Sequence, residues 1–89
     1  MSSRVQIFST RNCPFCKAAK RLLDVKQVAY NEVMVDTDAE QREEMVRRTK
    51  RTSVPQIFIG DFHVGGYQEM AELDADGKLD ELLKGAGGP

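Results

Sequence analysis

The sequence has little cysteine and histidine and no tryptophan. Its 89 residues include two cysteines, Cys13 and Cys16, and one histidine, His63. Small secreted proteins held together by disulfides usually carry four or more cysteines spread along the chain, so that class is disfavoured. A disulfide between residues three apart would close a very short loop and stabilise the fold little. A structural zinc site needs four ligands, and the chain has neither a second cysteine pair nor a second histidine.

Long hydrophobic stretches and an excess of one charge are also missing. The longest apolar runs, such as residues 57–59, are far too short to span a bilayer. The net charge is −1, from 13 basic and 14 acidic residues, and no aromatic-basic stripe is present. Residues 1–4 lead directly into a strand-like segment without an apolar signal region. We therefore expect a cytoplasmic protein whose partners are neither nucleic acid nor membrane.

What is present is the pattern of an α/β protein, and the length predicts a single domain over residues 1–89. Short β-prone apolar segments alternate with segments whose apolar residues recur every three or four positions. They predict strands at 5–8, 28–35, 56–59 and 62–64, and helices at 14–26, 37–49, around 70–73 and around 79–83. Thr37 and Glu40 have capping-box spacing, so Thr37 is the expected start of the second helix. We expect the last helix to stop at Gly85 and residues 85–89 to form a flexible tail.

This β-α-β-α-β-β-α-α order restricts the topology. The first three elements form a βαβ unit, which implies a parallel strand pair with a right-handed crossover. The last two strands are joined by Gly60-Asp61 and form a hairpin. The sequence therefore predicts a four-stranded mixed sheet flanked by helices on both faces.

The two cysteines lie at the start of the first predicted helix. Pro14 suits the first helical position, which places Cys13 where free backbone N–H groups and the helix dipole favour a thiolate. The thiolate is the nucleophile in disulfide exchange. Cys16 lies one turn further in, so we expect it to be more buried and to resolve a mixed disulfide on Cys13. An inert buried pair and half of a metal site are the alternatives.

Two further segments suggest a binding site near Cys13. A cis Val54-Pro55 bond would expose the Val54 backbone at a sheet edge, where an extended thiol peptide can pair by strand addition. A trans proline at the start of the strand is the alternative. Gly65-Gly66 allows close approach to the backbone, so the N–H groups that follow can hold a carboxylate, although a simple turn explains the glycines equally well.

The remaining polar residues are interpreted mainly as surface features. His63 alternates with Phe62 and Val64, so we expect it to face solvent from its strand. A basic set forms either a solvated face or a surface that attracts acidic ligands; it comprises Arg47, Arg48, Lys50 and Arg51.

Taken together, Cys-Pro-Phe-Cys at 13–16, Ser-Val-Pro-Gln-Ile-Phe-Ile-Gly at 53–60 and His-Val-Gly-Gly-Tyr at 63–67 resemble a dithiol glutaredoxin of the thioredoxin-like fold. The similarity runs from about Val5 to Leu83. It implies a glutathione-dependent thiol–disulfide oxidoreductase in which Cys13 and Cys16 are catalytic. The resemblance also implies glutathione as co-substrate, no metal, a monomer, and disulfide-bonded or glutathionylated proteins as substrates.

The resemblance also implies which residues bind glutathione. The Val54 backbone would pair with the cysteinyl part, and Arg42 would hold the glycyl carboxylate. The N–H groups of Tyr67 and Gln68 would bind the γ-glutamyl carboxylate. The full expected set is Arg11, Phe15, Arg42, Ser53, Val54, Pro55, Gly66, Tyr67 and Gln68.

Three positions depart from the family's usual residues. Thr10 replaces a common lysine, with Arg11 adjacent to it. Gln68-Glu69 stands where the family usually has an acidic or hydroxyl residue followed by aspartate, and Lys50 replaces a glycine.

Two other functions remain open at this stage. One is a thioredoxin-like electron donor that a flavoprotein reductase reduces. The other is an iron–sulfur carrier in which Cys13 thiolates from two subunits and two glutathiones ligate one cluster.

Overall fold

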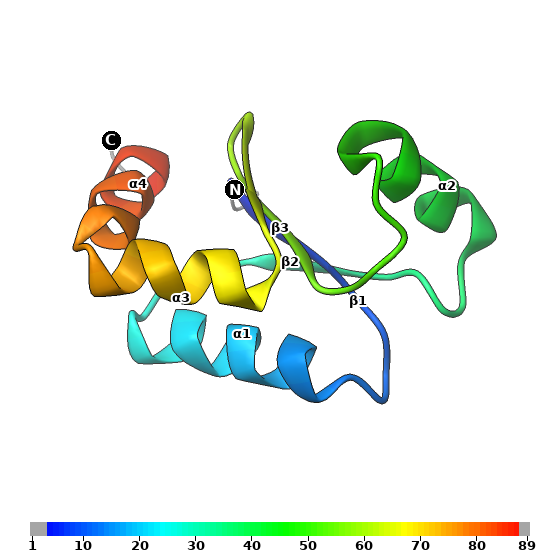
Figure 1. Cartoon of the computed structure of the whole chain (residues 1–89), viewed down its shortest axis with the longest axis horizontal. Coiled ribbons are helices and arrows are strands. Elements are labelled where there is room, and N and C mark those ends of the chain that lie inside the picture. The colour runs from blue at the N-terminus through cyan, green and yellow to red at the C-terminus, as the bar shows by residue number, and fades with distance from the viewer. Residues whose placement is uncertain (1–3, 88–89) are drawn as a thin grey trace.

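The computed structural model describes residues 4–87, which form strands and helices in the predicted order (Figure 1). The strands are β1 (Val5–Ser9), β2 (Asn31–Met34), β3 (Gln56–Ile59) and β4 (Phe62–Gly65). The helices are α1 (Pro14–Val25), α2 (Ala39–Thr49), α3 (Tyr67–Ala75) and α4 (Lys78–Gly87).

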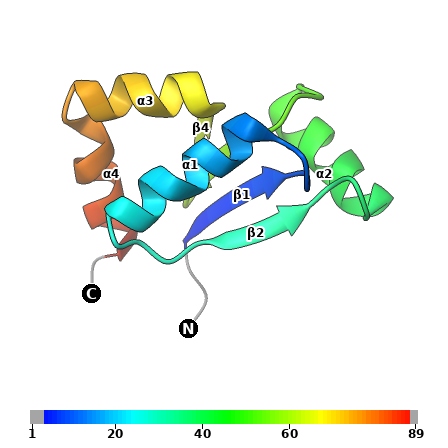
Figure 2. The ribbon, with the colours of Figure 1, turned by 90° about the horizontal axis from the view of Figure 1, so that it is seen from below.

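The strands form one mixed sheet in the spatial order β2-β1-β3-β4. β1 and β2 are parallel, whereas β3 is antiparallel to both β1 and β4. Figure 2 shows α1 crossing over between the two parallel strands. The four-stranded mixed sheet flanked by helices is therefore confirmed.

Alternate residues of each strand point to opposite faces of the sheet, and helices cover both faces. Val5 and Ile7 pack with residues of α1, α3 and α4, including Leu23 and Met70. On the other face, Phe8 and Phe58 pack with Met45 of α2. Figure 1 shows the same division, with α2 across the sheet from α1 and α3.

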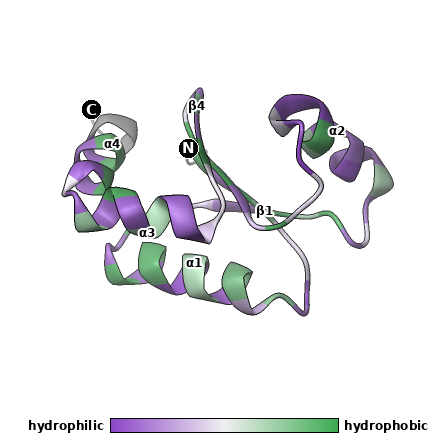
Figure 3. Cartoon of the chain, viewed as in Figure 1, coloured by the Kyte–Doolittle hydropathy of each residue, from purple (hydrophilic) through white to green (hydrophobic). Residues whose placement is uncertain are grey.

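Helix α2 covers its face of the sheet with a narrow apolar stripe. Figure 3 shows the helix coloured mostly as hydrophilic. Met45 is fully buried, and Val46 is partly buried against the same cluster. Phe8 of β1 and Phe58 of β3 supply large aromatic rings to the same cluster, which compensates for the few apolar residues of α2.

The predicted bounds of the second strand and of the last helix differ from the structure. The second strand is limited to 31–34, although Val28 and Tyr30 still pack against the core. The predicted stop at Gly85 is wrong, because α4 continues to Gly87. Glycine lowers helix stability without forbidding a helix, and the buried Leu79 and Leu83 hold α4 against the sheet. Of the expected tail, residues 88–89 lie outside the described residues.

The cap of α2 is also one residue later than predicted. Asp38, and not Thr37, occupies the N-cap, and its Oδ1 accepts a hydrogen bond from the Gln41 N–H at 3.2 Å. Both residue types cap helices well, so neighbouring candidates compete for the position.

This cap gives a stability prediction. Asp38→Ala should lower the free energy of unfolding by about 1 kcal/mol, because a first-turn N–H loses its acceptor. Thr37→Ala is the matched control and should change it little. Urea denaturation of both variants measures the difference, and an equal loss from the two would contradict the assignment.

In the part of the chain that the structure describes, no helix is both long and apolar enough to cross a membrane.

Candidate active site

Cys13 is the N-cap residue of α1, as the sequence predicts. Its backbone is extended (φ −124°, ψ 105°), and Pro14 occupies the first helical turn. The Cys16 N–H donates to Cys13 Sγ at 3.1 Å. A backbone N–H aimed at sulfur at the positive end of a helix stabilises negative charge there. The Cys13 sulfur therefore lies at the positive end of α1 with one backbone N–H directed at it.

Cys16 lies in a different environment one turn into α1. Its side chain is fully buried, whereas Cys13 is 8% exposed. Burial, followed by the interaction with Cys13, raises the pKa of Cys16 to about 12. At neutral pH Cys16 is therefore a protonated thiol beside the less deeply buried Cys13. Both cysteines are free thiols in this structure.

The contrast between the thiols predicts selective alkylation. At neutral pH, iodoacetamide should modify Cys13 and leave Cys16 intact in the reduced native protein, because the thiolate is the reacting form. Peptide mapping by mass spectrometry gives the ratio. The same protein in denaturant is the control and should be modified at both positions. Similar labelling of Cys13 and Cys16 in the native protein would contradict the assignment.

The segment before β3 lies directly beside Cys13. The Val54-Pro55 peptide bond is cis, in agreement with the sequence prediction. The Cys13 thiol lies 3.8 Å from the Val54 carbonyl oxygen, measured from Sγ. A Cβ atom placed on Gly66 would lie 3.5 Å from the Pro55 carbonyl oxygen, so the start of α3 also approaches this segment. Residues from three distant parts of the sequence therefore meet at one place.

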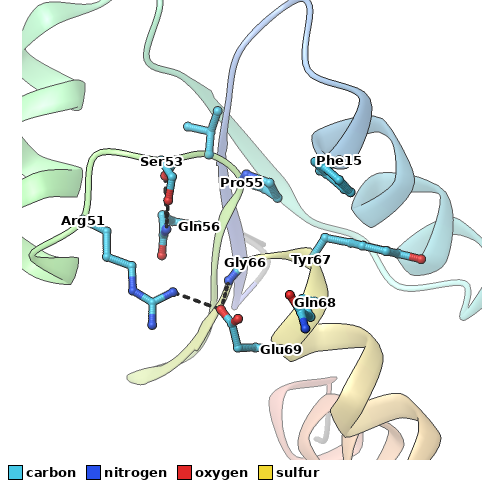
Figure 4. A pocket seen from close by; sticks show the side chains of 10 residues that line it. Phe15, Arg51, Ser53, Pro55, Gln56, Gly66, Tyr67, Gln68 and Glu69 are labelled. Carbon is cyan, nitrogen blue, oxygen red and sulfur yellow. Dashed lines mark hydrogen bonds and ion pairs between the residues drawn. The ribbon is translucent and has the colours of Figure 1, made fainter.

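A pocket opens at this junction (Figure 4). Phe15 and Tyr67 form one side, with ring centroids 6.2 Å apart and planes at 30°. The lining residues are Phe15, Arg51, Ser53, Val54, Pro55, Gln56, Gly66, Tyr67, Gln68 and Glu69. The structure thus brings together every residue of the expected glutathione set except Arg11 and Arg42.

The charges in the pocket belong to Arg51 and Glu69. Glu69 Oε1 accepts hydrogen bonds from the Gly66 N–H at 2.7 Å and from Arg51 Nη1 at 3.0 Å. These two hydrogen bonds lower the pKa of Glu69, and the one from the Gly66 N–H has the larger effect. Glu69 is therefore ionised at neutral pH. Figure 4 shows Arg51 reaching across the pocket to this carboxylate.

Arg11 and Arg42 lie elsewhere. Arg11 Nε forms an ion pair with Asp36 at 3.0 Å, and this hydrogen bond lowers the pKa of Asp36. Arg42 lines a separate cavity on α2 that includes Glu43 and Arg47. Contacts of Arg11 and Arg42 with glutathione therefore stay predictions.

Sequence reasoning did not place Arg51, Gln56 or Glu69 in the pocket. The sequence identifies Arg51 only as part of a basic set, because its position depends on how the chain leaves α2. Lys50 ends that helix in the left-handed conformation (φ 60°, ψ 24°), where the family usually has glycine. The chain then turns so that Arg51 points into the pocket.

The interpretation of His63 as a solvent-facing residue is wrong. Its ring is half-buried and stacks on Phe58, with centroids 4.8 Å apart and planes at 24°. The side chain does alternate with those of Phe62 and Val64, but it packs on Phe58 and bonds to Gln56 of β3.

Within residues 4–87, no group of three or more His, Cys, Asp or Glu side chains is arranged to hold a metal ion. The expectation that the protein uses no metal stays a prediction.

Comparison with known proteins gives a consistent picture. The family profile for glutaredoxin matches residues 5–64. Glutaredoxin 3 of Escherichia coli (strain K12) is 48% identical over 82 residues, covering 92% of this chain and 99% of that protein. The glutaredoxin of Pseudomonas aeruginosa is 46% identical over 79 residues, covering 89% of this chain and 94% of that protein.

Solved structures agree in fold. The crystal structure of a buckwheat glutaredoxin–glutathione complex matches with a TM-score of 0.88 at 28% identity, covering 96% of this chain and 80% of that one. The solution structure of glutaredoxin from Brucella melitensis matches with a TM-score of 0.80 at 44% identity, covering 94% and 90% respectively.

The sheet order and the thiol pair at the start of α1 define the class as a thioredoxin-like dithiol oxidoreductase. The family profile and the curated relatives are more specific: the chain belongs to the glutaredoxin family. Its homologues support a glutathione-dependent thiol oxidoreductase, and its thioredoxin-like fold is confirmed.

Proposed function

We propose that this glutaredoxin reduces glutathione mixed disulfides and protein disulfides, with Cys13 as nucleophile and Cys16 as resolving thiol. One observation carries the proposal. The Cys13 sulfur accepts a backbone N–H at the start of α1, beside the Val54 carbonyl at the pocket, while Cys16 is a buried thiol. Of the two cysteines, Cys13 is the less buried, and its sulfur accepts a backbone N–H at the start of the helix.

A glutathionylated protein reacts in two exchange steps. The Cys13 thiolate attacks the glutathione sulfur, the disulfide bond between glutathione and the substrate protein breaks, and the protein leaves as a thiolate that takes up a proton. Cys13 is then joined to glutathione. The thiolate of a second glutathione attacks the sulfur of the bound one, which releases oxidised glutathione and regenerates the Cys13 thiolate.

A protein disulfide requires the second cysteine. Attack by Cys13 leaves the substrate protein attached through a mixed disulfide and releases its other thiol. Cys16 then loses its proton and attacks Cys13, which forms a Cys13–Cys16 disulfide and releases the reduced protein. Two molecules of glutathione return the enzyme to the dithiol. In the reduced enzyme, burial and the neighbouring Cys13 raise the pKa of Cys16, so Cys16 must lose a proton for this step.

The pocket suits glutathione in an extended conformation along the Ser53–Pro55 segment. The Val54 backbone is available for pairing with the cysteinyl part, next to the reacting sulfur. Tyr67 and Gln68 lie in the first turn of α3 and line the pocket, so their N–H groups are the proposed donors to the γ-glutamyl carboxylate. The buckwheat relative was solved as a glutaredoxin–glutathione complex, which supports this ligand.

The second carboxylate of glutathione needs a cation, and two arginines are candidates. Arg51 lines the pocket, whereas Arg42 lies on α2 outside it. Arg51→Gln should raise KM for glutathione about three- to tenfold through loss of a charge-assisted contact in a partly exposed site. Arg42→Gln is the matched comparison and should change KM less. The opposite order in steady-state kinetics would assign the carboxylate to Arg42.

A coupled assay tests the proposed function. The oxidised protein should be reduced by glutathione with glutathione reductase, and poorly by thioredoxin reductase. Efficient reduction by thioredoxin reductase alone would favour the thioredoxin-like electron donor. A visible absorption band in anaerobically isolated protein would favour the iron–sulfur carrier.

The cytoplasmic location, the single-domain organisation and the monomeric state are further parts of the proposal. Size-exclusion chromatography with light scattering checks the monomer; a stable dimer would contradict it.

A further inference from the structure

His63 lies outside the pocket but is connected to it through the sheet. It is the cross-strand partner of Phe58 in the β3–β4 pair, and the two rings stack. The Arg48 guanidinium covers the same Phe58 ring, 4.0 Å from its centroid. His63 is thus held in a fixed orientation on the face of the sheet that carries α2.

Gln56 links His63 to the segment before β3. Its side chain is 1% exposed, and its Nε2 donates to the Ser53 carbonyl oxygen at 3.1 Å and to Ser53 Oγ at 3.3 Å. Its Oε1 lies 2.8 Å from His63 Nε2. A carbonyl oxygen only accepts, so the amide nitrogen must face Ser53 and the amide oxygen must face His63. The proton of the neutral imidazole therefore resides on Nε2.

The charge state of His63 is consistent with this arrangement. Burial, followed by the positive charge of Arg51, lowers its pKa, while Glu69 acts weakly in the opposite direction. Arg48 adds to the lowering. The imidazole is therefore neutral at neutral pH, and its single N–H is used by Gln56.

The other end of this chain of bonds is the reaction site. Ser53 is followed by Val54, whose carbonyl oxygen lies 3.8 Å from Cys13 Sγ. Ser53, Val54 and Gln56 all line the pocket, and Figure 4 shows the bond between Ser53 and Gln56. Hydrogen bonds and one peptide link thus connect His63 on β4 to Ser53 and Val54, which form the wall of the pocket beside Cys13.

We propose that His63 is a positioning residue for the disulfide substrate, and that it acts through Gln56 on the Ser53–Val54 wall. Without the His63 donor, the buried Gln56 oxygen lacks its partner and the amide can rotate away from Ser53. The wall that pairs with glutathione would then be less well fixed. This inference rests on the proposed function, because the wall matters only if it binds a disulfide substrate.

Two substitutions separate positioning from packing. His63→Phe keeps a ring against Phe58 but removes the N–H donor. His63→Gln places an amide N–H near the position of Nε2. If His63 only packs against the sheet, the phenylalanine variant should behave like wild type and the glutamine variant should be worse.

Steady-state measurements of KM and kcat should show the difference between these variants. His63→Phe should raise KM for a glutathionylated peptide about three- to tenfold, as expected for loss of one buried hydrogen bond, with little change in kcat. His63→Gln should restore most of the loss. Phe62→Ala, an exposed change on the same strand, is the control and should leave KM unchanged. In a Gln56→Met background, His63→Phe should have little further effect, because both act through one chain of bonds.

Nitrogen NMR on the wild-type protein gives an independent readout that does not depend on any variant folding. The Nε2–H tautomer of neutral His63 is the expected form. A proton on Nδ1, an unchanged KM in active His63→Phe, or no rescue by His63→Gln would each overturn the positioning role. A wild-type protein without glutathione-dependent turnover would instead contradict the proposed function, so the two failures are distinguishable.

Discussion

Replacing Cys13 with serine should reduce glutathione-coupled turnover to the rate measured without enzyme. A serine hydroxyl ionises far less readily than a thiol and cannot form the mixed disulfide on which every later step depends. The loss should be equally complete for a glutathionylated peptide and for a protein disulfide, because Cys13 makes the first attack in both. The coupled assay with glutathione reductase measures the two rates.

The fold of this variant should be intact, which makes the result interpretable. A serine oxygen at the N-cap still accepts the Cys16 N–H, and serine is a favoured cap residue. Its melting temperature should therefore match that of the wild type. Residual turnover well above background in a folded Cys13→Ser variant would assign the nucleophile elsewhere.

Replacing Cys16 should instead separate the two substrate classes. Cys16→Ser should keep most of its activity on a glutathionylated peptide, since glutathione itself resolves that intermediate. Reduction of a protein disulfide such as that of insulin should fall to near background, because the attached substrate is no longer released by an internal thiol.

Because Cys16 is buried, this variant needs a second substitution as a control. Cys16 is fully buried, so a serine hydroxyl there costs stability unless it finds a partner. Cys16→Ala removes the thiol without adding a buried hydroxyl and should show the same split between substrates. Equal loss of both activities in Cys16→Ala would contradict the role of Cys16 as resolving thiol.

Most of the fold follows from local patterns in the sequence. The short apolar β-prone run in β1 and the three-and-four spacing in α1 predict their elements, and the βαβ order predicts the parallel pair. The cap of α2 was misplaced because Thr37 and Asp38 are adjacent and chemically similar as caps. The end of α4 was misplaced because the packing of Leu79 and Leu83 outweighs the local preference of Gly85.

The site was predictable only in part, for a spatial reason. The segments around Cys13, Val54 and Tyr67 carry distinctive residues, and the structure brings all three to one pocket. Arg51 and His63 carry no such signal. Arg51 reaches the pocket because Lys50 turns the chain, and His63 is half-buried because it packs on Phe58 and bonds to Gln56.

The central claim is that Cys13 attacks the glutathione sulfur and carries glutathione as the intermediate. Mass spectrometry of Cys16→Ser, rapidly quenched during reaction with a glutathionylated peptide, tests it most directly. The predicted result is one glutathione on Cys13 and free peptide thiol in solution. Peptide attached to Cys13, or no adduct on Cys13 while turnover proceeds, would contradict the account.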